Sequence, residues 1–444
     1  MSAASFLRRL FGRSQDALDP ATRYLLSLCE SLLGERGETL GAAIAREALA
    51  VYRTLDERGR ERFFDVLAKD YSPLPQVVCD AAEAYRREPD ADNLIRLQEA
   101  VDPARQELFR RLNMAQGGTA VILDMRRLIL KGLDAHPHWR VIDADLRHLL
   151  RSWFNRGFLK LERIDWHTSA IVLEKLIEYE AVHAIQGWPD LRRRLESDRR
   201  CFAFFHPQVP DEPLIFIEVA LTQGMSGSVQ PLLDVAASVA SGAEADTAIF
   251  YSITNCQEGL RGISFGNLLI KQVAEELQRE LPHVRTFATL SPIPGFRRWL
   301  DSARARLGAG DGGKERLALL ESIEDPAWHT RKIPERLTQL LLQACAWYLV
   351  NAKQGAEPLD AVARFHLGNG AALARLNWLG DTSPSGMKRA AGLMVNYVYR
   401  LADVERNHER YFRHHIVVAS RAVTKLAREC PIGVQPPASA QSPT

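Results

Sequence analysis

The stretch that decides the fold is residues 247–291, TAIFYSITNCQEGLRGISFGNLLIKQVAEELQRELPHVRTFATLS. It begins with a short aromatic and β-branched run (247–254) and ends with a second one (284–291), and such runs are typical of strands. Between them, a turn that contains glycine leads into residues 269–281, where an apolar residue recurs every four positions as on one face of a helix. The stretch therefore predicts a strand, a helix and a strand in succession, a βαβ-like unit.

Other segments extend this pattern on both sides. The runs CFAFFHPQ (201–208) and PLIFIEVALT (213–222) also predict strands, whereas the chain beyond Leu300 is mainly helical in periodicity, most clearly in RLTQLLLQACAWYLV (336–350). From about 21 to 151, apolar residues recur at helical spacing between breaks that contain Pro or Gly. The predicted fold is a mixed α+β and α/β chain: an N-terminal all-helical bundle that serves packing or oligomerisation, then a mixed β-sheet domain with flanking helices.

Composition excludes several classes of function. The chain has 444 residues and a formal net charge of +2, and no run of Lys and Arg is interleaved with aromatic residues, so we expect no nucleic-acid partner. No apolar run approaches the roughly 20 residues of a membrane helix.

The six cysteines lie far apart with no Cys-x-x-Cys pair, which predicts neither a zinc site nor disulfides and favours a reducing cytoplasm. Arg-containing residues 1–14 leave a mitochondrial transit peptide as the alternative.

The turn before the predicted helix carries the richest chemical signal. Gly259, Gly262 and Gly266 punctuate it, and backbone amides from Gly262 to Asn267 at a helix N-terminus would favour an anion such as a phosphate or pyrophosphate. The spacing matches neither a P-loop nor the dinucleotide fingerprint. Three glycines in a turn are also compatible with a purely structural role.

A resemblance rests on five stretches taken together: HPQVPDEPLIFIEVALT, FYSITNCQEGLRGISFGNLLIKQVAEELQRELP, LSPIPGF, ARFHLGNGAALARLNWLGD and GLMVNYVYRL. In this order they closely resemble malonyl-CoA decarboxylase over residues 201–400. The resemblance implies a catalytic half similar to the GNAT acyltransferase fold, whose glycine turn holds the coenzyme A pyrophosphate between two splayed strands. It also implies a catalytic serine that acts as proton acceptor, Ser291 of SPIPGF, and a catalytic histidine that acts as proton donor, His366 of FHLGNG. The implied substrate-binding residues are these two and the turn: Arg261, Gly262, Ile263, Ser264, Phe265, Gly266 and Asn267.

The implied activity is decarboxylation of malonyl-CoA to acetyl-CoA and CO₂ through an enolate, as part of fatty acid metabolism, with no metal or other cofactor because the thioester is itself the electron sink. Malonyl-CoA and acetyl-CoA are then the ligands, in a homo-oligomer, a dimer or tetramer. Two alternatives stay open, a GNAT-type acyltransferase and a non-catalytic acyl-CoA sensor. The chain ends in QSPT rather than Ser-Lys-Leu, which disfavours a peroxisomal address. The expected domains are residues 1–152 (helical), 153–430 (catalytic) and 431–444 (disordered tail).

Ser291 and His366 also have simpler interpretations. Two prolines and a glycine follow Ser291, so it could merely end a strand, and a histidine among apolar residues is more often packed than reactive. As a proton donor, His366 would titrate near neutrality. Glu218 and Glu258 are both candidates to orient it, and the sequence does not decide between them.

Overall fold

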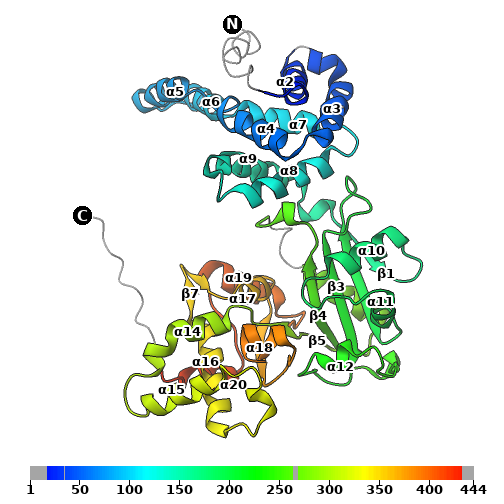
Figure 1. Cartoon of the computed structure of the whole chain (residues 1–444), viewed down its shortest axis with the longest axis vertical. Coiled ribbons are helices and arrows are strands. Elements are labelled where there is room, and N and C mark those ends of the chain that lie inside the picture. The colour runs from blue at the N-terminus through cyan, green and yellow to red at the C-terminus, as the bar shows by residue number, and fades with distance from the viewer. Residues whose placement is uncertain (1–17, 35, 264–268, 433–444) are drawn as a thin grey trace. The chain divides into compact units, whose positions relative to one another are not determined.

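The computed structural model describes residues 18–34, 36–263 and 269–432 (Figure 1). Contacts divide the chain into two compact units, which are described separately. The first consists of Met1–Lys160, Phe205–Leu214 and Gln257–Phe265, and the second of Leu161–Phe204, Ile215–Cys256 and Gly266–Thr444. Among the described residues, no helix combines the length and the apolar character needed to cross a lipid bilayer.

The first unit is helical, as the sequence predicts. Its helices begin at recognisable caps: the Asp19 side chain accepts from the Thr22 amide, and the Asp56 side chain accepts from the Gly59 amide. Aromatic rings, among them Tyr52, fill its core. The elements are α2 (Pro20–Leu33), α3 (Arg36–Thr54), α4 (Glu57–Lys69), α5 (Pro75–Arg87), α6 (Ala91–Val101), α7 (Ala104–Asn113), α8 (Gly118–Gly132), η2 (Pro137–Trp139), α9 (Arg140–Trp153), η3 (Arg156–Phe158) and η5 (Glu258–Leu260).

The second unit is built on a mixed sheet in the order β1-β2-β3-β4-β5-β10-β6, with β9 paired to β10. Strands β4 and β5 are parallel and α13 (Leu269–Glu280) lies between them in sequence, so the predicted βαβ-like unit is confirmed. The strands are β1 (Lys160–Ile164), β2 (Arg199–Phe205), β3 (Ile215–Thr222), β4 (Thr247–Asn255), β5 (Thr286–Thr289), β6 (Ser291–Pro292), β9 (Ala372–Asn377) and β10 (Met394–Val398), with a separate hairpin of β7 (Lys353–Gln354) and β8 (Glu357–Pro358).

Helices flank this sheet, and the strongest predicted helix is found as α16. Strands β7, β8, β9 and β10 interrupt the region beyond Leu300 that the sequence predicts as mainly helical. The helices are α10 (Ala170–Tyr179), α11 (Trp188–Arg194), α12 (Gln230–Leu233), η4 (Gly242–Glu244), α14 (Phe296–Leu307), α15 (Gly313–Ser322), η6 (Trp328–Thr330), α16 (Glu335–Asn351), α17 (Ala361–Gly368), α18 (Pro384–Ala390), α19 (Val404–His414) and α20 (Arg421–Arg428).

Strand β6 continues the pairing of β5 with β10 in the same register. Ala288 pairs with Val398, Ser291 with Val395, and Pro292 with Met394, which is one unbroken antiparallel register along β10. The strand ends at Pro292, one residue beyond the run 284–291 that the sequence predicts. The proline at 292 fits because the strand separates here from its parallel neighbour β4, so no ladder partner on that side needs its missing N–H.

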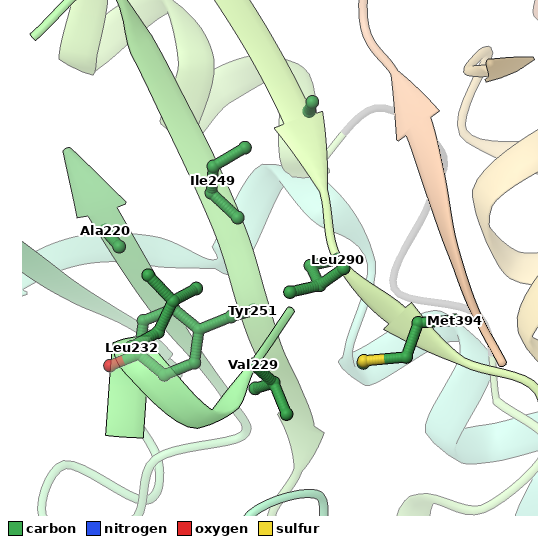
Figure 2. Packing of buried hydrophobic residues seen from close by; sticks show 8 residues of the cluster. Ala220, Val229, Leu232, Ile249, Tyr251, Leu290 and Met394 are labelled. Atoms are coloured by element: carbon green, nitrogen blue, oxygen red, sulfur yellow. The ribbon is translucent and has the colours of Figure 1, made fainter. Parts of the chain in front are cut away.

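One face of the sheet is closed by an apolar cluster (Figure 2). Side chains from β3, β4, the β5–β6 strand and β10 meet Val229 and Leu232, which come from the segment around α12. Leu290 belongs to this cluster. Because side chains alternate along a strand, Thr289 and Ser291 project from the opposite face. The apolar cluster fixes the strand from one side and leaves the two hydroxyls for the other.

Candidate active site

A cavity opens where β4 and β5 part. The two strands pair in parallel as far as Phe250 and Thr289, and the Leu290 amide still donates to the Phe250 carbonyl at 2.9 Å. Beyond this point β4 stays with β3, up to the pair of Asn255 and Ile215, while β6 stays with β10. The divergence encloses about 220 Å³, within the second unit. The lining residues are Val182, Phe250, Tyr251, Ile253, Asn255, Leu290, Ser291, Pro292, Ala361, Val362, Phe365 and His366.

Ser291 and His366 meet in this cavity. The Oγ of Ser291 lies 3.0 Å from Nε2 of His366, and the two residues are only 5% and 3% exposed. Ser291 comes from β6 and His366 from the last turn of α17. Elements far apart in sequence thus converge on one hydrogen bond, as expected for residues that share a chemical role.

Helix α17 is held firmly at its beginning. Asp360 is the N-cap, and its side chain accepts from the Ala363 amide at 2.9 Å. The Tyr348 hydroxyl of α16 donates to the same carboxylate at 3.3 Å. The cap fixes the start of a short helix, and with it the direction in which His366 points.

Two tyrosines from β10 and the residues after it hold the imidazole from its other side. The Tyr399 hydroxyl lies 2.8 Å from Nδ1 of His366, and the Tyr397 ring stacks on the imidazole with centroids 4.6 Å apart. Ser291 donates to Oγ1 of Thr289 at 2.9 Å. Because the Ser291 proton is directed at Thr289, the Ser291 oxygen accepts from Nε2 of the neutral imidazole. Nδ1 then carries no proton and accepts from the Tyr399 hydroxyl. The hydrogen bonds therefore run in one direction, from Tyr399 through His366 to Ser291.

Burial sets the charge of this array. Because the imidazole is enclosed, desolvation lowers the pKa of His366 to about 3. The sequence-based expectation of an imidazole that titrates near neutrality does not hold for the ligand-free site. At neutral pH His366 is an uncharged imidazole, able to accept at one nitrogen and to donate at the other.

Asn396 holds the strand that carries the serine. Its side-chain NH₂ donates to the Thr289 carbonyl at 2.6 Å and to the Ser226 carbonyl at 3.1 Å. Its carbonyl oxygen accepts from Arg375 at 3.0 Å and from Asn377 at 2.9 Å. Asn396 is fully buried, so every hydrogen-bonding group of this amide has a partner and β5, β9 and β10 are joined beside the site.

The glycine turn is described only in part. Ser264, Phe265, Gly266 and Asn267 lie outside the described residues. Arg261 is exposed and Ile263 is buried. Gly262 has a positive φ of 76° and open space where a Cβ would stand, so backbone conformation rather than crowding favours glycine there.

These described turn residues belong to the first unit, whereas Ser291 and His366 belong to the second. Within the first unit, Arg126 of α8 anchors the turn: its guanidinium donates to the Gly259 carbonyl at 2.6 Å and to the Arg261 carbonyl at 2.9 Å, and it pairs with Asp143 at 2.8 Å. Gly259 is required for a different reason from Gly262, because a Cβ there would lie 2.3 Å from the Leu123 carbonyl oxygen.

Other candidates from the sequence have different partners. Glu218 forms an ion pair with Arg194 at 2.8 Å, and Glu258 pairs with Lys131 at 3.2 Å, so the partner of His366 at Nδ1 is the Tyr399 hydroxyl rather than a carboxylate. Thr289, Asn396, Tyr397 and Tyr399 are the site residues that the sequence did not reveal. A signal was present for the tyrosines, since NYVYRL belongs to one of the stretches that carry the resemblance.

The comparisons with known proteins agree over both parts of the chain. Residues 71–154 match the family model of the malonyl-CoA decarboxylase N-terminal domain, and residues 157–435 match that of the malonyl-CoA decarboxylase C-terminal domain. Malonyl-CoA decarboxylase, mitochondrial, from Anser anser anser is 36% identical over 417 residues, which is 86% of this chain and 83% of that protein.

Two crystal structures show the same fold. Malonyl-CoA decarboxylase from Rhodopseudomonas palustris is 49% identical, with a TM-score of 0.86 over 91% of this chain and 99% of that chain. The enzyme of that name from Agrobacterium vitis is 46% identical, with a TM-score of 0.84 over 90% of this chain and 99% of that chain.

Proposed function

The chain belongs to the malonyl-CoA decarboxylase family, and on that premise we propose that it converts malonyl-CoA to acetyl-CoA and CO₂ with Ser291 and His366 as its catalytic residues. The observation that carries this assignment is the 3.0 Å contact between Ser291 and His366 inside the cavity where β4 and β5 part. The malonyl group enters this cavity.

The cavity lining suits loss of CO₂. Most of the lining side chains are apolar, among them Phe250, Leu290 and Val362. A carboxylate that leaves water for such a site loses hydration, whereas CO₂ is uncharged and loses little. When the bond between the carboxyl carbon and the methylene carbon breaks, its electron pair moves onto the thioester as an enolate. Fixed hydrogen-bond donors then stabilise the charge that develops on the thioester oxygen.

The reaction takes up one proton, because the enolate carbon must be protonated to give acetyl-CoA. His366 is uncharged in the ligand-free site. The malonyl carboxylate brings a negative charge into the cavity, which favours the imidazolium and raises the pKa of His366. The imidazolium donates through Nε2 to Ser291, and the proton passes to the methylene carbon. In the imidazolium Nδ1 also carries a proton, which it donates to the Tyr399 hydroxyl, so this contact keeps the ring oriented during the transfer.

Coenzyme A binds to the glycine turn, with Arg261, Gly262 and Ile263 and the residues that follow, Ser264, Phe265, Gly266 and Asn267, around its pyrophosphate. What supports this assignment is the family and the positive φ of Gly262, a conformation that exposes backbone amides to an anion. Arg126 contributes by holding the turn at the Gly259 and Arg261 carbonyls.

The decisive experiment supplies purified chain with malonyl-CoA alone and follows acetyl-CoA and CO₂ together. We expect equal amounts of both products. An acyltransferase would need an acceptor amine or hydroxyl before it released coenzyme A, and a sensor would bind malonyl-CoA without turnover. Either result would replace the decarboxylase assignment. The same assay with Ser291→Ala and His366→Asn tests the two catalytic roles separately from the activity.

We further propose that residues 1–152 form the oligomerisation domain of a homo-oligomer and residues 153–430 the catalytic domain. Helices α5 and α6 project from their unit (Figure 1), and none of their residues is buried. Val77 of α5 and Ile95 of α6 are apolar and about half exposed, so a partner subunit could cover them. Light scattering of Val77→Glu with Ile95→Glu should show a smaller particle than wild type. The exposed Leu40→Glu of α3 is the control, and an unchanged mass in the double variant would place the interface elsewhere.

The cytoplasm remains the proposed location, because the cysteines lie far apart in the sequence with no Cys-x-x-Cys pair. The goose relative is named mitochondrial, so import is the alternative. Cell fractionation separates the two.

A further inference from the structure

Among the described residues, two imidazoles and a carboxylate converge in the first unit, whereas the residues that line the cavity at Ser291 belong to the second. Asp65 of α4 faces His136 and His138, which stand on either side of Pro137 at η2. One ligand atom from each of the three residues lies within 4.8 Å of the others. Asp65 and the two histidines are more than 70 residues apart in sequence, so the fold rather than local chain geometry brings them together.

One buried tryptophan orients Asp65 and His136 directly, and Asp65 in turn contacts His138. Trp139 is 2% exposed, and its indole N–H donates to Oδ1 of Asp65 at 2.8 Å. The His136 ring stacks on the indole with centroids 4.1 Å apart and planes 5° apart. Nε2 of His138 lies 2.7 Å from the same Oδ1. Outer contacts of this kind, which fix the direction of a carboxylate or an imidazole, are what metal ligands require.

The tryptophan is itself locked in place. Its ring meets Phe64 of α4 edge-on at 5.2 Å. Gly132 at the end of α8 makes room for it, since a Cβ there would lie 2.4 Å from the indole. Pro137 restricts the backbone between the two histidines. The ligand set therefore stands on a rigid base, although its metal-facing side is open to solvent.

A simple ion pair would need only His138 and Asp65. This cluster also contains a second imidazole, that of His136, and a second carboxylate lies beside it. Glu61 stands one helical turn before Asp65, and its Oε1 lies 3.9 Å from Nε2 of His136. Zinc bonds to histidine nitrogen and carboxylate oxygen are about 2.0–2.2 Å long, so ligand atoms around a tetrahedral ion are roughly 3.3 Å apart. The observed separations of the ligand atoms, from 2.7 Å between His138 and Asp65 up to at most 4.8 Å, span this value.

We propose that Asp65, His136 and His138 bind one divalent transition metal ion of the zinc class, with Glu61 or water as the fourth ligand. Two neutral imidazoles and a carboxylate suit Zn²⁺ and Cu²⁺ better than Mg²⁺ or Ca²⁺, which prefer oxygen ligands. The ion joins α4 to η2. The ion binds the folded unit more tightly than the unfolded chain, so it stabilises the helical unit by mass action. It takes no part in decarboxylation.

The test uses the full-length chain without an affinity tag, freed of metal with EDTA. Zn²⁺ alone is titrated by calorimetry, and thermal unfolding is recorded with and without Zn²⁺. We expect one ion per chain and a higher melting temperature with Zn²⁺. His136→Asn and Asp65→Asn should each lose at least tenfold in affinity and lose the shift. Asp65→Asn keeps an oxygen that can accept from Trp139, so the metal-free variant should melt near the metal-free wild type.

The matched control is His167→Asn, which removes an exposed histidine that also has an aspartate neighbour, Asp165 at 3.5 Å. It should bind Zn²⁺ as wild type does. The spectrum of the Cu²⁺ form gives a second readout: splitting from two imidazole nitrogens in wild type and from one in His136→Asn. No binding by wild type, or equal binding by wild type and both ligand variants, would overturn the proposal.

Discussion

The Oγ of Ser291 and Nε2 of His366 lie 3.0 Å apart, although 75 residues separate them in the chain. Strand β6 supplies one atom and helix α17 the other. The cavity at this contact exists because β4 and the β5–β6 strand keep different neighbours after Phe250 and Leu290. Contact and cavity therefore depend on the same divergence of strands.

Removing either catalytic group should reduce turnover strongly. A positioned proton donor contributes about 10²–10⁴-fold, so we expect His366→Asn to lower kcat by a factor in this range with little change in KM. Ser291→Ala should behave similarly. Because both are proposed to act in one transition state, the double variant should lose far less than the product of the single losses. Near-normal kcat with a lower melting temperature in both variants would show that the pair only packs.

Tyr399→Phe should lower kcat while KM stays close to wild type, because its hydroxyl orients His366 through Nδ1 and Tyr399 is not among the residues that line the cavity. Tyr397→Phe is the matched control. That ring also stacks on His366, but its hydroxyl has no hydrogen-bond partner among the described residues. Steady-state kinetics on both variants should separate them, and equal losses would mean that the rings rather than the Tyr399 hydroxyl position the imidazole.

His366 should make the protein sensitive to acid. Its folded pKa of about 3 lies below the ordinary 6.5, so between these values the unfolded state binds one more proton than the folded state. Folding stability is therefore present above pH 6.5 and falls as the pH falls toward 3, by about 1.4 kcal/mol per unit. Urea unfolding at pH 7 and pH 5 should show that His366→Asn loses about 2 kcal/mol less than wild type over this interval. Equal losses would contradict the depressed pKa.

Gly262→Val should raise KM for malonyl-CoA more than it lowers kcat, because phosphate contacts are shared by the ground and transition states. A side chain at φ 76° also strains the backbone. Gly355→Val, at φ 62° between β7 and β8 and likewise with open space around it, carries the same strain away from the turn. If both variants have a wild-type KM, the anion site is not at Gly262.

Decarboxylation should survive EDTA followed by gel filtration, because the proposed chemistry uses Ser291, His366 and the thioester and needs no metal. Chelation should nevertheless lower the melting temperature if the Asp65, His136 and His138 site is filled. Activity and thermal unfolding measured on one treated sample test both expectations, and turnover that returns only with added Zn²⁺ or Mg²⁺ would defeat the first.

The fold was largely predictable where the apolar positions of the sequence are also the positions that the fold buries. Strands β2 to β5, α13 and α16 come from apolar or strictly periodic runs. Strands β9 and β10 were missed because ALARLN and MVNYV carry polar residues at positions that the fold buries, such as Asn396. That asparagine is tolerated inside only because four hydrogen bonds satisfy it, and sequence alone does not show those partners.

The candidate site was predictable in its two central residues and not in their surroundings. Ser291 and His366 came from the family resemblance, but the pKa of His366 depends on an enclosure that forms only in the fold. The sequence suggested a glutamate as the partner of His366, but the group at Nδ1 is the hydroxyl of Tyr399, which directly follows β10. The cluster at His136 and His138 was missed for the same reason, since its third member, Asp65, is distant in sequence.

Strand β10 has a consequence for synthesis of the protein. It is the last strand among the described residues, yet it pairs with the strand that carries Ser291, supplies Asn396, and leads directly into Tyr399. A chain still growing on the ribosome therefore lacks the contacts that hold Ser291 and His366, the pair proposed as catalytic, until residue 399 has emerged. A premature stop codon before that residue would leave about nine-tenths of the sequence without these contacts, so we expect activity to appear only when translation is almost finished.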